Sequence, residues 1–128
     1  MNNRSLEYFC YSGIIMKIVY CKRFPPLGFS AINLFGFIIV RKDYGNLSEA
    51  DKIHELIHTK QMVELLWIFF YLFYIIEWII RFIQYRDKLE AYKNISFERE
   101  AYSMMYNRSY LKQRSSFAFT NYYKIKKK

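Results

Sequence analysis

Two histidines four residues apart, with a glutamate directly after the first, are the residues of this sequence best suited to chemistry. They are His54 and His58, the only histidines among 128 residues, and the glutamate is Glu55. Side chains four apart share one face of a helix, so both imidazoles can bind one zinc ion. Zinc lowers the pKa of a water molecule to about 7, and the glutamate can remove its proton. The pattern predicts a hydrolytic zinc site; the alternative is two ordinary histidines on a helix face.

A catalytic zinc site also needs a third protein ligand, and it keeps its fourth position open for water. Three carboxylates are candidates for this ligand. Glu64 lies further along the same helix, and if that helix simply continues, its side chain is turned away from the histidines. Glu98 and Glu100 lie at the start of a later predicted helix, and because they are two residues apart they point to different faces. Only one of these two can therefore face the metal.

The residues around these carboxylates resemble a known group of metallopeptidases. His54-Glu55-x-x-His58 followed by Phe97-Glu98-x-x-Ala101 is similar to the gluzincins, above all to the membrane group of prenyl-protein endopeptidases and heat-shock-induced membrane proteases. It also resembles the minimal gluzincins and a set of small uncharacterised bacterial proteins. The resemblance implies that Glu98 is the third zinc ligand. It departs at Tyr102, where the group has an aspartate that supports the metal ligands.

The same resemblance implies residues for catalysis and for substrate binding. In the group, a histidine or tyrosine opposite the zinc stabilises the oxyanion that forms when water attacks a carbonyl, and here Tyr102 is the expected residue, with Tyr106 and Arg99 as alternatives. The group also places an edge strand with an asparagine before the metal helix. Asn33 and Phe35 occupy that place, so we expect them to bind a peptide substrate by β-augmentation.

The strands and helices that must position these residues can be predicted from β-branched runs, helix-capping residues and the positions of Gly and Pro. Residues 31–41 are rich in β-branched and aromatic residues and predict a strand, bulged at Gly36. Ser48 is a good N-cap for the helix that carries the histidines, with Asp51 forming a shortened capping box. A later helix is predicted over residues 96–110 with Ser96 as its cap. No Pro or Gly follows Gly45, so nothing in the sequence forces a break between the helices.

Residues 65–83 form an apolar run that is interrupted only by Glu77 and Arg81. As a helix it is about 28 Å long, close to the thickness of a bilayer's hydrocarbon core. A simple span would place His58 and Glu98 on opposite sides of the membrane, so a complete zinc site and one simple span exclude each other. We therefore expect the segment to re-enter or to lie in the membrane interface. A homodimer that buries this helix is the alternative.

Composition restricts the class of protein and its partners. Apolar residues make up 53% of the chain and aromatic residues 21%, which excludes a disordered chain. Lys and Arg number 20 against 11 Asp and Glu, a net charge of +9. This favours a membrane lipid surface, on the cytoplasmic side, as the anionic partner. Nucleic acid is disfavoured because the basic residues form no recognisable binding module. Cys10 and Cys21 are too few for a disulfide framework.

These observations predict one domain that is mainly α, of the α+β class, with a zincin-like helical core and a short strand or hairpin before the metal helix. Residues 16–110 form the expected domain, because Met16 looks like a chain start and residues 1–15 like an extension with little structural role. Residues 111–128 form a basic tail. The predicted function is a membrane-associated zinc metallopeptidase that hydrolyses a peptide or protein substrate. The alternative is a non-catalytic membrane-associated protein with a structural or vestigial zinc site.

Overall fold

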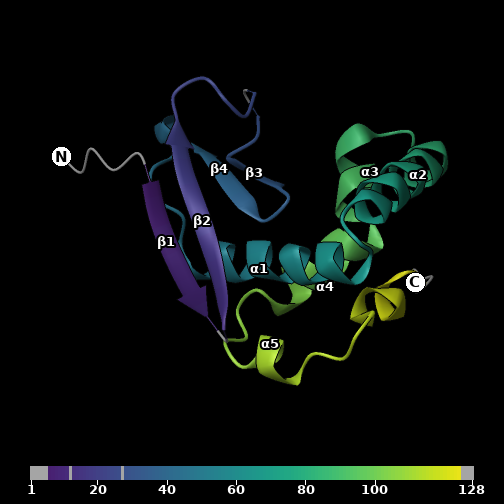
Figure 1. The fold of residues 1–128 in the computed structure, drawn as a ribbon. Coiled ribbons are helices and arrows are strands. Elements are labelled where there is room, and N and C mark those ends of the chain that lie inside the picture. Colours follow the sequence, from purple (N-terminus) through teal and green to yellow (C-terminus); the bar gives the residue numbers. More distant parts are fainter. Residues whose placement is uncertain (1–5, 12, 27, 125–128) are drawn as a thin grey trace.

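The computed structural model describes residues 6–11, 13–26 and 28–124, and within them the chain is an α+β fold (Figure 1). The strands are β1 (Leu6–Tyr11), β2 (Ile14–Cys21), β3 (Ala31–Leu34) and β4 (Phe37–Arg41). The helices are α1 (Glu49–Glu64), α2 (Ile68–Tyr85), α3 (Lys88–Lys93), α4 (Ser96–Met104) and α5 (Tyr110–Gln113), with short 3-10 helices at Lys42–Tyr44 and Ala118–Tyr122. The predicted fold class is confirmed.

The strands form one mixed sheet in the order β1-β2-β4-β3. β1 pairs with β2 in antiparallel fashion from Leu6↔Val19 to Tyr11↔Ile14, and β2 runs parallel to β4. Residues 6–11 lie within the range expected to be an extension of little structural role, yet they form this edge strand and give that range a structural role. Residues 1–5 lie outside the described part of the chain.

β3 and β4 form a hairpin, so the single strand predicted over residues 31–41 is wrong, and the hairpin predicted as its alternative before the metal helix is confirmed. The chain reverses at Phe35 and Gly36, whose φ angles are 53° and 89°. A two-residue loop with positive φ at both positions matches the right-handed twist of the flanking strands. Gly36 is also close to the ring of Trp67, from which an added Cβ would be 3.6 Å away. The glycine therefore marks a turn and not a bulge.

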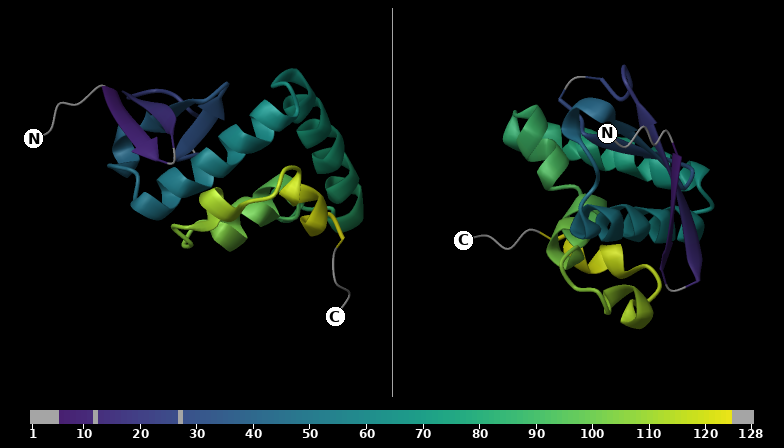
Figure 2. Two further views of the ribbon diagram at one scale, coloured as in Figure 1. Left: turned by 60° about the horizontal axis from the view of Figure 1, so that its bottom comes forward. Right: turned by 90° about the vertical axis from the view of Figure 1, so that its left-hand side faces the viewer.

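α1 connects the sheet to the rest of the molecule. Ser48 is its N-cap, as predicted, and forms a capping box with Asp51. One face of α1 packs against the sheet (Figure 2), and this core contains Met16, Ile18, Ile38, Val40, Ile53, Leu56 and Ile57. Its histidines lie on another face, which is directed toward α4. The packing of α1 on the sheet thus fixes the direction in which the two imidazoles point.

The chain turns sharply between α1 and α2, where the sequence has no signal for a break. Leu66 and Trp67 both adopt positive φ, 54° and 63°, and the Trp67 N–H donates to the carbonyl of Met62 at 2.7 Å. α2 therefore starts at Ile68 instead of residue 65 and ends at Tyr85 instead of residue 83. This corner turns α2 back so that its side chains reach the first turn of α4.

The segments after α2 are more broken than the sequence suggested. The polar stretch that follows it contains α3, capped by the side chain of Asp87. α4 ends at Met104, well before residue 110, and its N-cap is Ile95, so the assignment of Ser96 as the cap is wrong. Ser96 is instead the first helical residue. The side chain that satisfies its backbone N–H comes from α2, as described below.

Much of the expected basic tail is folded onto the domain. Arg114 forms ion pairs with Glu64 of α1 and Glu100 of α4. Phe119 packs against Phe97, with ring centroids 4.5 Å apart. Within residues 111–124, therefore, the expected tail contacts both α1 and α4. Residues 125–128 lie outside the described residues.

Candidate metal centre

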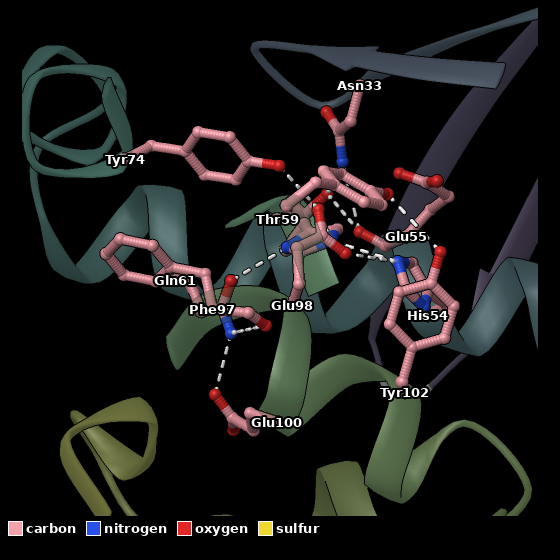
Figure 3. A network of polar contacts seen from close by, with 12 residues as sticks. Asn33, His54, Glu55, Thr59, Gln61, Tyr74, Phe97, Glu98, Glu100 and Tyr102 are labelled. Carbon is pink, nitrogen blue, oxygen red and sulfur yellow. Dashed lines mark hydrogen bonds and ion pairs between the residues drawn. The ribbon is translucent and has the colours of Figure 1, made fainter. Parts of the chain in front are cut away.

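His54, His58 and Glu98 meet between α1 and α4. Figure 3 shows two of them, His54 and Glu98, facing each other. The Glu98 carboxylate lies between the two rings, with one oxygen 3.2 Å from the His54 Nε2 and the other 3.2 Å from the His58 Nε2. The two Nε2 atoms are 3.0 Å apart. Potential ligand atoms of all three residues lie within 4.8 Å of one another. The group could therefore hold a metal ion, with ligands from two separate helices.

The other two carboxylates considered from the sequence, those of Glu64 and Glu100, bind groups other than the two histidines. Glu64 binds Arg114 and the backbone N–H of Phe117. Glu100 is fully buried and is held by Gln61, Tyr110 and Arg114. Neither is part of the group that could bind a metal within the described residues. Of the three candidates for the third ligand, the fold brings only Glu98 to the imidazoles.

The group fits a cation in its donor chemistry as well as in its geometry. All three residues are buried, and the Glu98 Oε2 has no hydrogen-bond partner among the described residues. A buried carboxylate oxygen without a hydrogen bond is costly unless another positive group or an ion faces it. Two imidazole nitrogens and one carboxylate oxygen are a common set of protein ligands for a divalent metal ion.

Gln61 holds His58 from behind and was not recognised as a site residue from the sequence. Its Oε1 accepts a hydrogen bond from the His58 Nδ1 at 2.8 Å, which leaves the Nε2 free to face the metal position. Its side-chain amide donates to the carbonyl of Phe97 and to the Glu100 carboxylate. A buried chain of hydrogen bonds thus connects α4 through Gln61 to His58. The corresponding nitrogen of His54, Nδ1, has no hydrogen-bond partner in the described residues.

Glu98 is supported from α2, the apolar helix. The Tyr74 hydroxyl donates to the Glu98 Oε1 at 2.8 Å. Glu77, also on α2, accepts hydrogen bonds from the backbone N–H and the hydroxyl of Ser96, two residues before Glu98. Arg81, four residues after Glu77 on the same face of α2, lies 3.4 Å from the Glu77 carboxylate. The polar residues of α2 therefore contribute to the position of the third ligand.

The three buried side chains form a charged cluster whose pKa values are displaced. Burial lowers the pKa of His58, but the charge and hydrogen bond of Glu98 outweigh burial and raise that pKa to about 9. Burial raises the pKa of Glu98, but the charge of His58 and the close approach of both imidazole Nε2 atoms, each 3.2 Å from a carboxylate oxygen, hold that pKa well below its usual range. The carboxylate is therefore ionised and can serve as an anionic ligand.

Glu55 lies next to the group in a small pocket whose lining includes His54, Tyr92 and Tyr102. Figure 3 shows Glu55 close to His54 and Tyr102. Burial raises the pKa of Glu55 above its ordinary value, and the nearby histidine charges offset only part of that increase. A carboxylate with a raised pKa is a better proton acceptor near neutral pH. This position suits the general-base role predicted for Glu55, which remains a prediction.

The three candidates for stabilising an oxyanion differ in where they lie. Tyr102 packs edge-on against His54, with ring centroids 4.5 Å apart, and its hydroxyl is 3.3 Å from that of Tyr92. Tyr106 is 81% exposed, and Arg99 binds carbonyls of the C-terminal segment. Of these three, Tyr102 is the one that lines the pocket beside the histidines. Its catalytic role remains a prediction.

The edge strand β3 lies over α1 beside the pocket. Asn33 is buried, and its side-chain amide donates to the Glu55 carbonyl at 3.0 Å and to the Thr59 hydroxyl at 3.1 Å. The asparagine side chain therefore anchors the strand to the metal helix. Phe35 is 53% exposed at the hairpin turn and packs against Tyr71 of α2. Both residues thus frame the edge, and their predicted contact with substrate remains a prediction.

The free edge of β3 presents backbone groups on the side of the pocket. The Arg41 N–H donates to the Ser30 carbonyl, and hydrogen-bonded pairs alternate along an antiparallel ladder, so Ala31 and Asn33 direct their backbone groups away from β4. Ala31 also lines the pocket that contains His54. At Asn33 the edge is occupied, because the Tyr71 hydroxyl donates to the Asn33 carbonyl and accepts from the Phe35 N–H.

No protein-family model matches this chain, and no curated protein or solved structure is significantly similar to it. No relative therefore supplies a fold, a ligand or an activity for it. The arrangement of the chain's own residues is what supports a function.

Several residues that build the site carried no signal that a single sequence reveals. Tyr74 and Glu77 lie in a run that was interpreted for its apolar character, and Tyr92 lies between the two predicted helices, where no element was predicted. Gln61 did have a local signal, because it lies three residues after His58 and therefore on the same face of the helix. The other three act across the fold, and their roles depend on the corner that turns α2 back.

Proposed function

We propose that this protein is a zinc-dependent metallopeptidase of the gluzincin type. The observation that carries the proposal is the convergence of His54, His58 and Glu98, with Glu55 in the adjoining pocket. The third ligand is a glutamate supplied by a later helix, which is the ligand set that the resemblance to gluzincins implied. The proposed substrate is a peptide or protein segment.

Zinc is the ion that best suits this ligand set. Imidazole nitrogens and a carboxylate oxygen are typical zinc ligands, whereas magnesium and calcium prefer oxygen ligands throughout. A structural zinc site usually fills four positions with protein, and the described residues supply three. The fourth position is then open to water, as catalysis requires.

The proposed reaction assigns a task to each residue around the ion. A bound zinc ion supplies Lewis-acid chemistry, which polarises a carbonyl and acidifies water. Glu55 accepts the proton of the attacking water and passes it to the leaving amine. Tyr102 donates a hydrogen bond to the oxygen that becomes negatively charged, and burial raises the pKa of Tyr102, so its hydroxyl keeps its proton.

The free edge of β3 supports a peptide as the substrate. An extended peptide can add to an exposed strand through backbone hydrogen bonds, which requires no particular side-chain sequence. The outward backbone groups of Ala31 lie where the strand borders the pocket with His54 and Glu55. A peptide bond held there lies beside the proposed base.

Metal analysis tests the ligand set. Protein purified without a metal-affinity tag should contain about one zinc per chain by elemental mass spectrometry. His54→Ala, His58→Ala and Glu98→Ala should each lose the ion, whereas Glu49→Ala, an exposed change on α1, should retain it. Tight zinc binding by Glu98→Ala would contradict the ligand assignment, and an equimolar ion other than zinc would contradict the choice of metal.

Replacement of the general base tests the activity. Glu55→Gln should retain zinc but lower the turnover of an internally quenched peptide library by roughly 10²-fold or more. Glu49→Gln is the matched control, because it makes the same chemical change on the same helix away from the pocket. Turnover of Glu55→Gln equal to that of the control would end the peptidase proposal.

A non-catalytic protein with a structural metal site is the second candidate function. The deep burial of all three ligands favours it, because structural sites are closed to solvent. In that case zinc removal should lower the melting temperature while no peptide in the library is cleaved by the zinc-loaded protein. Catalysis that depends on Glu55 would exclude this candidate.

A further inference from the structure

α2 carries a continuous apolar face that nothing in the described chain covers. Its large side chains there are between 36% and 71% exposed: Ile68, Phe69, Leu72, Phe73, Ile75, Ile76, Ile79, Ile80 and Ile83. The helix is long and apolar enough to cross a membrane by length and composition alone. Soluble monomers rarely expose an apolar surface of this extent. We call these nine residues the outer face of α2.

The charged residues of α2 do not lie on this face. Glu77 and Arg81 are both buried on the opposite side of the helix, where they bind Ser96 and the C-terminal segment. The hydroxyls of Tyr71 and Tyr74 also point inward, to the hairpin and to Glu98. Between Ile68 and Ile83, all of which is described, the helix therefore separates an apolar outer side from a polar inner side.

The fold is incompatible with a simple span by α2. His58 precedes the helix and Glu98 follows it, yet their side chains are 3.2 Å apart. The inner side of α2 is in contact with the domain near both ends, at Phe70 in its first turn and at Arg81 in its last turns. Both chain ends of the helix therefore lie on the same side of any bilayer that the outer face could touch.

Basic residues lie near both ends of α2. Arg86 and Lys88 follow α2 directly and are exposed, and the exposed Asp87 between them caps α3 through its carboxylate. Near the other end, the Lys17 ammonium lies 5.8 Å from the ring centre of Phe37, an exposed residue of the hairpin whose turn packs against α2. With a net charge of +9, a second copy of this chain would be repelled, whereas anionic lipid headgroups would be attracted.

We propose that the outer face of α2 is a membrane-docking surface that lies in the headgroup–acyl boundary of an anionic bilayer, with the helix axis parallel to the bilayer plane. Amphipathic helices with an apolar face and flanking basic residues bind membranes in this way. The cytoplasmic leaflet, which carries anionic lipids, is the matching surface. Tyr74 of this helix donates a hydrogen bond to Glu98, so a docked α2 would hold the metal centre close to the membrane. If the proposed peptidase function holds, on which this step rests, the substrates are peptide segments near the membrane.

Vesicle sedimentation of the full chain tests the docking surface. The wild-type protein should bind vesicles of 30% phosphatidylglycerol in phosphatidylcholine at least about tenfold more tightly than pure phosphatidylcholine vesicles. Leu72→Glu/Ile76→Glu should lose at least about tenfold of that binding, because two outer-face residues can no longer enter lipid. Tyr8→Glu/Tyr106→Glu, which changes the charge equally at exposed positions away from α2, should bind like the wild type.

Two results would overturn the proposal in this assay. One is equal binding by the two double variants. The other is a wild-type dimer, measured by light scattering without detergent, that Leu72→Glu/Ile76→Glu converts to monomers, since the outer face would then cover a second copy. The assay measures vesicle binding and not peptide turnover. A negative result would therefore contradict the docking surface without contradicting the peptidase proposal.

Spin labels give a second measurement that introduces no charge. Both native cysteines are replaced by serine, and single cysteines are labelled at Leu72, Ile76, Ile79 and Ile83. A helix in the bilayer plane places the labels at similar depths, within about 5 Å, by power saturation with oxygen and a nickel complex. A spanning helix would spread them over about 16 Å. A graded depth profile, or no immersion at all, would contradict in-plane docking.

Discussion

Glu77 of α2 accepts two hydrogen bonds from Ser96, one from its backbone N–H at 2.7 Å and one from its hydroxyl at 2.6 Å. Ser96 is the first residue of α4, and the first N–H groups of a helix have no partners within it. The carboxylate of one helix thus caps the next, two residues before Glu98. An acidic residue inside an apolar segment is explained by this contact, which the sequence could not show.

Removing this cap should weaken the protein and its metal site together. Glu77→Ala leaves Arg81 buried beside an uncapped helix, and we expect a loss of about 3–5 kcal/mol in the free energy of unfolding. Urea unfolding of the metal-free protein measures this. Glu77→Ala/Arg81→Met removes both charges and should recover part of the loss. Equal stability of the single variant and the wild type would contradict the capping role.

Gln61 should control the affinity of the site for zinc without binding the ion itself. Gln61→Ala removes the partner of the His58 Nδ1, and loss of such a support typically costs about 10–100-fold in metal affinity. Competition with a chromophoric chelator measures this affinity. The matched control is Gln113→Ala on α5, an exposed change. Wild-type affinity in Gln61→Ala would show that His58 is oriented by packing alone.

Tyr74 and Tyr71 allow a comparison between two tyrosines on the same helix. Tyr74→Phe removes the hydrogen bond to Glu98, and because bonds to charged groups are worth about 1.5–3 kcal/mol, we expect zinc affinity to fall by roughly tenfold or more. Tyr71→Phe removes hydrogen bonds to the hairpin but touches no ligand, so zinc affinity should stay within about twofold of the wild type. Equal affinities of the two variants would remove Tyr74 from the site.

The metal-free protein should lose stability as the pH rises from 6.5 to 9. The pKa of His58 is raised from 6.5 to about 9 by Glu98, so its contribution is complete below pH 6.5 and is lost as the pH passes through 9. The pKa of Glu98 is lowered from 4.5, so its contribution is complete above about pH 4.5 and is lost at lower pH. The contribution of this cluster should therefore be greatest between about pH 4.5 and 6.5.

Melting temperatures of the chelator-treated protein across pH 5–9 test this dependence. His58→Gln, which cannot be protonated at this position, should show a flatter profile above pH 6.5. Zinc competes with the proton for His58, so zinc affinity should rise over the interval in which the metal-free protein weakens. A wild-type melting temperature that rises between pH 6.5 and 9 would contradict the assignment.

The parts of the fold that depend on local rules could be predicted from the sequence. Ser48 caps α1 because its hydroxyl and the Asp51 carboxylate meet within one turn, and His54 and His58 share a face because of helical spacing. The α+β class follows from the same local patterns. Glu98 came from a resemblance between motifs, and the fold brings it to the imidazoles.

The remaining features could not be predicted because they depend on distant contacts. Leu66 and Trp67 adopt positive φ in a corner without glycine, so no residue type marked the break between α1 and α2. The support of His58 by Gln61 depends on Glu100, 39 residues away. β1 was missed because a methionine at residue 16 was interpreted as a chain start. Each of these features is decided by tertiary packing.

Tyr71 also determines how the sheet can meet other chains. Edge strands normally offer a row of unpaired backbone groups on which a neighbouring molecule can template aggregation. At β3 the Tyr71 hydroxyl donates to the Asn33 carbonyl and accepts from the Phe35 N–H. An incoming strand therefore cannot pair with the hairpin beyond Asn33. One tyrosine side chain therefore limits self-assembly along this edge. Backbone pairing with another strand remains open only in the short stretch around Ala31, beside the histidines.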